Sequence, residues 1–189
     1  MRGIRMRHAM TSMPGRQGGA VLIIALLLLV VLTLLGTSSM QNTVLQERMA
    51  GNMNQRNLGL QAAEAALREG ESWLAGLAAA PVEKSTSPNS SEVWKRDAPI
   101  VNSDRYWWTQ ASESWWNSGS TRQATEYDAV PGQSAPRYVI EHRFFKQDNQ
   151  VVGFGPPTGR DYHRLTARGV GQTNTAKTTL QSHFTRRYN

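Results

Sequence analysis

An uncharged apolar run, Gly18–Ser39, places the strongest constraint on what this chain can form. Its centre, Ala20–Leu35, contains one hydroxyl side chain, Thr33, and no ionisable residue occurs between Arg16 and Glu47. A helix rises about 1.5 Å per residue and the hydrocarbon core of a bilayer is about 30 Å thick, so a helix over this stretch is long enough to cross a membrane. We therefore expect a membrane-inserted helix here.

The residues before the run predict its direction of insertion. The basic side chains Arg2, Arg5, Arg7 and Arg16 precede it, and residues 1–19 contain no acid. Because cytoplasmic flanks carry an excess of Lys and Arg, the N-terminus should stay in the cytoplasm while the rest of the chain is exported. We expect an inner-membrane protein whose C-terminal part is periplasmic.

Two glycines separate this basic leader from the apolar run. An ordinary secretory signal is cut after its apolar region, where Gly36–Ser38 is a weak candidate. A cut after Gly19 would instead remove residues 1–19 and leave the hydrophobic helix as the new N-terminus, starting at Ala20. A cut after Gly18 is the alternative.

This arrangement resembles the class III signal of type IV prepilins, which a dedicated prepilin peptidase cuts on the cytoplasmic side after a glycine. Residues 16–74 closely resemble the N-terminal region of PilX-type minor pilins through a combination of pieces: glycine before the run, then ERMAGN, then QAAEAALREGE. The resemblance implies a structural subunit without catalytic activity, whose partners are other minor pilins, the major pilin and a tip adhesin. It also implies a cell-surface pilus as the final location.

A helical period of apolar residues continues beyond the run. These residues recur at spacings of three, four or seven: Met49, Met53, Leu60, Ala63, Leu67, Gly70, Leu74 and Leu77. The pattern predicts one helix from Ala20 to about Ala79, which Pro81 ends. Residues 20–39 should lie in the membrane or the filament core, and residues 40–79 should form an amphipathic half.

The first part of this helix is the predicted assembly interface. We expect it to pack against other pilins through apolar side chains on the run: Val21, Leu22, Ile24, Leu27, Leu28, Val31 and Leu35.

Position 24 is informative because a carboxylate is missing there. Major pilins that this chain resembles carry a glutamate at the fifth position after the cut, where it meets the amino terminus of a neighbouring subunit. Here that position is Ile24, or Ile23 if the cut follows Gly18. A subunit without a neighbour on that side should favour an apolar residue, because an unpaired buried carboxylate costs several kcal/mol. This favours a place at or near the filament tip; the alternative is that isoleucine is merely tolerated in a low-copy subunit.

Residues 80–189 read as one globular domain. Pro81–Glu92 is predicted to be an exposed loop, a short helix is predicted over about 104–117, and alternation predicts strands over 137–146, 150–154, 162–170 and 175–188. The expected fold class is α+β, pilin-like, with the long N-terminal helix packed on a three- or four-stranded antiparallel sheet.

Alternation also assigns the strand residues to faces. It places His142 and Phe144 on one face with Tyr138 and Ile140, and it directs Arg164, Thr166 and Arg168 outward while the residues between them face the core. Along residues 175–188 alternation directs Ala176, Thr178, Leu180, Ser182 and Phe184 inward. It thereby puts His183 on the face opposite His142 and His163, so a three-histidine metal site is not expected.

A group of tryptophans has two interpretations. Trp107, Trp108, Trp115 and Trp116 either fill the core of a small domain that has no cysteine for disulfides, or contact a partner. The lack of cysteine departs from the usual pilin pattern, in which a disulfide closes a C-terminal loop.

The sequence predicts no chemistry. It contains no G-x-S-x-G, H-E-x-x-H, phosphate-binding glycine loop or cysteine nucleophile, so we expect no enzyme, no cofactor and no metal. The leader arginines supply most of the formal charge of +7, and residues 20–189 carry only +3, so no nucleic-acid partner is expected.

Two other functions stay open from the residues. A pseudopilin of a type II secretion system would share the same helix logic. A membrane-anchored periplasmic enzyme or receptor would be favoured if the mature protein began at Met1 or after Ser38.

Overall fold

The computed structural model describes residues 18–99, 106–148 and 158–188. The predicted strand over 150–154 and most of the leader lie outside these ranges. The chain forms two compact units, Met1–Arg48 and Met49–Asn189.

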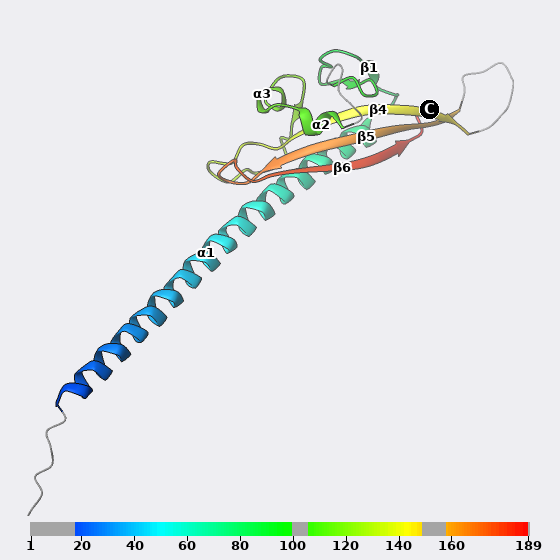
Figure 1. Ribbon diagram of the computed structural model, residues 1–189. Coiled ribbons are helices and arrows are strands. Elements are labelled where there is room, and N and C mark those ends of the chain that lie inside the picture. Colours follow the sequence, from blue (N-terminus) through cyan, green and yellow to red (C-terminus); the bar gives the residue numbers. More distant parts are fainter. Residues whose placement is uncertain (1–17, 100–105, 149–157, 189) are drawn as a thin grey trace, which may run out of the picture. The chain divides into compact units, whose positions relative to one another are not determined.

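One helix, α1, runs continuously from Gly18 to Gly76 (Figure 1). The predicted long helix is thus present, and it ends three residues before the expected Ala79. Neither Gly36 nor Gly51 interrupts it. Among the described residues, α1 is the one helix long and apolar enough to cross a membrane, with a mean hydropathy of 3.0 over its most apolar window.

The sheet of the second unit is larger than predicted and mixed. Its three long strands are antiparallel: β4 (Arg137–Gln147), β5 (Gly159–Val170) and β6 (Lys177–Arg186). Three short strands join them in the order β1-β2-β4-β5-β6, with β3 also pairing with β4: β1 (Val82–Lys84), β2 (Glu92–Trp94) and β3 (Arg122–Gln123).

The predicted α+β class is confirmed, but an all-antiparallel sheet of three or four strands is wrong. β1 pairs parallel to β2, and β2 pairs parallel to β4. The segment predicted to be a loop, Pro81–Glu92, contains β1. The sequence does not reveal this strand, because three residues are too few to show alternation.

A stripe of small residues on α1 packs against the sheet. The buried members of the stripe are Gly59, Ala62, Ala63, Ala66, Gly70 and Leu74. Of the residues in the predicted apolar period, Ala63, Gly70 and Leu74 are buried, whereas Met49, Met53 and Leu60 are 62%, 65% and 38% exposed. A Cβ added at Gly169 of β5 would overlap the backbone of α1. The helix therefore lies so close to β5 that only small residues fit at this contact.

The core between α1 and the sheet is apolar. Its buried residues come from α1, β2, β4, β5 and the segment after β3: Ala66, Leu74, Val93, Ala124, Tyr138, Ile140, Leu165 and Ala167. On β6 the predicted alternation is confirmed, since Leu180 and Phe184 are half-buried while His183 between them is exposed.

The second face of the sheet is also covered, which the sequence did not predict. Arg164, Thr166 and Arg168 were expected to point outward, yet all three are buried. Two one-turn helices, α2 (Trp107–Gln110) and α3 (Glu113–Trp116), lie on this side (Figure 1).

The predicted single helix over 104–117 is wrong because its middle is extended. Ala111 adopts ψ 122° and ends α2, and the Ser112 hydroxyl accepts a hydrogen bond from the Trp115 backbone nitrogen (3.2 Å), which starts α3.

A bulge in β4 also overturns one face assignment. His142 pairs with His163, but Phe144 pairs with Tyr162, so Arg143 is an extra residue on β4. The shift turns Phe144 away from the face of His142, and its ring stacks on Tyr162 with centroids 4.5 Å apart.

Candidate assembly interfaces

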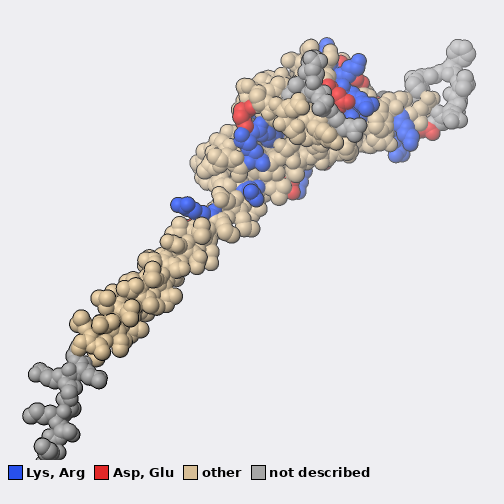
Figure 2. Space-filling view, in the orientation of Figure 1, with Lys and Arg blue, Asp and Glu red and all other residues tan. Residues whose placement is uncertain are grey.

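The first unit presents an apolar helix surface. Every predicted interface residue of α1 is exposed: Val21, Leu22, Ile24, Leu27, Leu28, Val31 and Leu35. Figure 2 shows this part of the helix without any acidic or basic side chain. A surface of this kind packs against lipid or against other apolar helices.

Two threonine hydroxyls on this surface are satisfied within the helix. Thr33 donates to the Val30 carbonyl oxygen at 2.8 Å, and Thr37 donates to the Leu34 carbonyl oxygen at 3.0 Å. A hydroxyl bonded to its own helix needs no water, so neither residue hinders burial of the surface in an apolar environment.

The predicted cleavage site lies at the start of α1. Gly19 and Ala20 are exposed in its first turn, and a Cβ added to Gly19 would meet nothing within 4 Å. The position of the cut stays a prediction, as does Gly18 as its alternative.

The tryptophans divide into an interior and a surface pair. Trp107 and Trp116 are 0% and 2% exposed and form a second core cluster with Trp94 and Val139. Trp108 and Trp115 pack on the outside of this cluster and are half-buried. Of the four candidate contact residues, Trp108 and Trp115 therefore have surface to offer a partner, while Trp107 and Trp116 fill the core of their own chain.

A buried carboxylate fixes this tryptophan cluster to the sheet. Glu141 of β4 is fully buried and accepts hydrogen bonds from Arg164 Nε and Nη2 at 2.9 Å each. It also accepts one from Trp107 Nε1 at 3.1 Å. Burial raises the pKa of Glu141, and the charge of Arg164 opposes that rise. The buried Glu141–Arg164 pair therefore holds α2 on the second face of the sheet through the hydrogen bond from Trp107.

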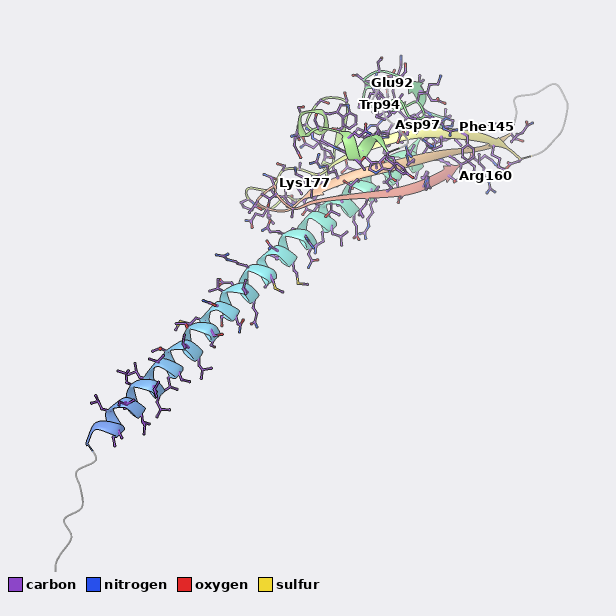
Figure 3. The ribbon with its side chains drawn as sticks, in the orientation of Figure 1. Glu92, Trp94, Asp97, Phe145, Arg160 and Lys177 are labelled. Atoms are coloured by element: carbon purple, nitrogen blue, oxygen red, sulfur yellow. The ribbon has the colours of Figure 1, made fainter. Side chains whose placement is uncertain are left out.

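Asp97 extends the buried pair to the loop after β2 (Figure 3). Its backbone nitrogen donates to Glu141 at 3.3 Å, and its carboxylate accepts from Arg143 at 2.6 Å and from Arg164 at 3.3 Å. Partial burial disfavours the charged form of Asp97, but the hydrogen bond and charge of Arg143 hold its pKa below the ordinary value. The sequence signal for this network is a glutamate inside the apolar stretch YVIEHRFF.

Glu113 makes a second link between the covering helices and the sheet. Its carboxylate contacts Arg168 of β5 and Lys177 of β6. The hydrogen bond from Lys177 lowers the pKa of Glu113, which partial burial opposes.

The three histidines of the domain do not converge. His142 and His163 lie with ring centroids 5.2 Å apart, whereas His183 pairs with Arg164 on the opposite face, as alternation predicts. His142 contacts the carboxylates of Glu83 (2.7 Å) and Asp161 (2.9 Å). Within the part of the chain that the structure describes, no three His, Asp or Glu side chains are arranged to hold a metal ion.

His163 is buried without a polar partner. Neither ring nitrogen forms a hydrogen bond with any residue that the structure describes, and the side chain is 0% exposed. Burial, aided by the nearby His142, lowers its pKa to about 4.

Comparison with protein families identifies the chain's relatives. The family model described as PilX N-terminal matches residues 17–68, and the model described as type IV pilus assembly protein PilX C-term matches residues 61–186. The chain belongs to the PilX family. Its resemblance to PilX-type minor pilins is thereby confirmed, and the match extends well beyond residues 16–74.

PilX membership accounts for the apolar half of α1 as a membrane anchor and pilus component. The family is one of structural pilus subunits that take part in type IV pilus assembly, which implies contacts with other pilins. No curated protein and no solved structure matches the chain.

Proposed function

We propose that this PilX-family chain is a minor pilin that primes assembly at or near the tip of a type IV pilus. Its partners are other minor pilins, the major pilin and a tip adhesin. Before assembly it lies in the inner membrane with a cytoplasmic N-terminus and a periplasmic C-terminal domain. Prepilin peptidase removes the leader between Gly19 and Ala20, and the subunit then enters a cell-surface filament.

The residue that carries this proposal is Ile24. It is 57% exposed on an apolar helix surface, so it becomes buried wherever this surface packs against other helices. A carboxylate at this position would need a cationic partner, because burying it alone costs several kcal/mol. An isoleucine needs none, which suits a subunit that has no neighbour to supply the amino group.

Contacts with specific partners are assigned to the second unit. Trp108 and Trp115 pack against the buried Trp107 and Trp116, so little side-chain freedom is lost when they are covered. Half-buried aromatic residues on such a support are typical anchors of protein interfaces.

The test replaces Ile24 in a strain that lacks the native chain. Wild type and Ile24→Leu should restore filaments, since both side chains are apolar. Ile24→Glu should lower the number of filaments per cell by more than about tenfold, because an unpaired carboxylate in the bundle costs more than about 1.4 kcal/mol. Filaments are counted by electron microscopy, and the subunit is located by immunogold labelling.

Membrane levels of each variant serve as the control for insertion. Normal filament numbers together with an unchanged location of the Ile24→Glu subunit would contradict the priming role. Loss of filaments with Ile24→Leu would show that position 24 acts through shape rather than charge.

A further inference from the structure

β6 forms an open edge of the sheet. It stands last in the strand order and pairs with β5 from Val170–Lys177 to Asp161–Arg186 without a register shift (Figure 1). Within residues 18–99, 106–148 and 158–188, no other strand pairs with it. Its second edge therefore offers ten residues of regular extended backbone.

The ladder to β5 shows which backbone groups are free. Gly171 donates its backbone nitrogen to the Ala176 carbonyl oxygen at 2.8 Å, so residue 176 faces β5. In an antiparallel ladder the residues alternate between facing one neighbour and facing the other. The N–H and C=O groups directed to the open edge are thus those of the odd-numbered residues: Lys177, Thr179, Gln181, His183 and Thr185.

β6 lacks the features that normally protect an edge strand. It has no proline, and no Lys, Arg, Asp or Glu occurs between Lys177 and Arg186. The opposite edge differs, because β1 has three residues and two of them, Glu83 and Lys84, are charged. Long, regular and uncharged edges are templates for the addition of another strand.

The helix-facing row of β6 is left partly uncovered. Its members are only half-buried, whereas the neighbouring row on β5 is fully buried at Leu165 and Ala167. Leu180 and Phe184 are the apolar residues of the half-buried row. A further strand with apolar residues on this face would extend the core over them.

Excess positive charge marks both ends of this edge. At one end Arg168 and Lys177 share the single carboxylate of Glu113. At the other end Arg186 donates to the Leu74 carbonyl oxygen at 2.6 Å and has no carboxylate within salt-bridge distance among the described residues. Figure 3 marks Lys177 at the start of β6.

This charge pattern argues against a second copy as the occupant. Because the odd-numbered residues face the open edge, antiparallel pairing of β6 with itself joins odd residues to odd residues, and the register that pairs all of β6 places Lys177 opposite Arg187 at both ends. Like charges directly opposite each other are destabilising.

We propose that the open edge of β6 binds an extended strand of another protein, with alternating apolar and hydroxyl residues and an acidic residue near each end. Backbone hydrogen bonds give the affinity in such strand addition, and side chains give the specificity. This site is independent of the priming role, since it requires only the folded second unit.

The test measures binding of a synthetic strand peptide to the purified full chain in detergent. The peptide has nine residues that alternate valine and threonine between two terminal glutamates, and the matched peptide carries lysine at both ends. The glutamate peptide should bind about tenfold more tightly in fluorescence anisotropy, because each end gains a favourable charge pair.

Two variants at Thr179 separate backbone from side chain. Thr179→Pro removes an N–H that faces the open edge and spares the β5 ladder, so it should weaken binding about tenfold, the equivalent of one hydrogen bond. Thr179→Ala keeps the N–H and should bind like wild type. The melting temperatures of both variants are compared with wild type to verify the fold.

Three results would overturn the proposal: no binding of the glutamate peptide, equal binding of the two peptides, or wild-type binding by a folded Thr179→Pro variant. Self-association of the full chain that Thr179→Pro abolishes would also overturn it, since the occupant would then be a second copy. None of these results bears on the Ile24 experiment, which is made in cells.

Discussion

His163 makes the stability of the second unit depend on pH. Its pKa falls to about 4 in the folded chain, whereas an unfolded histidine titrates near pH 6.5. Between these values the unfolded chain binds a proton that the folded chain excludes, so stability is present at neutral pH and is lost as the pH falls. At about pH 4.5 the loss from this residue should be about 2.5 kcal/mol.

The variant His163→Leu should remove this part of the pH dependence. Its free energy of unfolding should change less than that of wild type between about pH 7 and about pH 4.5, as measured by urea denaturation of the full chain in detergent. The exposed His183→Leu is the matched control and should retain the wild-type slope. An unchanged slope in His163→Leu would contradict the role assigned to His163.

Single residues were the least predictable part of this molecule. Arg164 and Arg168 have the sequence character of surface residues, and both are buried because Glu141 and Glu113 meet their charges. Buried cations need such partners, but the partners are 23 and 55 residues away in sequence. Alternation could assign these arginines to a face, yet it could not show that the face is covered.

At the scale of elements, α1 packs closely on β5 at Gly169. A Cβ at Gly169 would overlap the backbone of Gly59 and Ala63, so Gly169→Ala should force the helix from the sheet and destabilise the chain by about 3 kcal/mol. Gly51→Ala is the matched control, because nothing lies within 4 Å of its added Cβ. It should leave stability unchanged or raise it by up to about 1 kcal/mol through helix propensity.

Thermal unfolding of both glycine variants measures this difference. A Gly169→Ala variant as stable as wild type would show that α1 and β5 tolerate a wider separation. The close approach also explains why the small Gly59 is buried at this contact while the larger Leu60 is exposed. At this contact small size decides which residues face the sheet.

Long elements were predictable and short ones were not. The helix and the β4 and β6 strands each repeat their periodicity several times, so the pattern exceeds chance variation. β1 and β2 have three residues each and are specified by pairing, β1 with β2 and β2 with β4, rather than by their own sequence. The one-turn helices α2 and α3 likewise depend on packing of their tryptophans in the second core.

At the scale of the whole molecule, we propose that the leader and the apolar helix act in sequence. The exposed apolar surface of α1 explains why the subunit requires lipid or other helices throughout its life. Removal of residues 1–19 would delete four arginines and lower the formal charge from +7 to +3. The proposed cut would therefore remove the charges that favour a cytoplasmic N-terminus.

Replacement of Gly19 tests this order of events. Protein isolated from membranes should begin at Ala20 by N-terminal sequencing, and Gly19→Leu should retain the leader, because a large side chain then replaces the glycine after which the proposed cut is made. Gly18→Ala is the control and should still be cut. Uncut protein should remain in the membrane and be absent from sheared filaments. A mature start at Gly19 would move the cut to follow Gly18, and an intact leader in wild type would favour a membrane-anchored periplasmic protein over a pilus subunit.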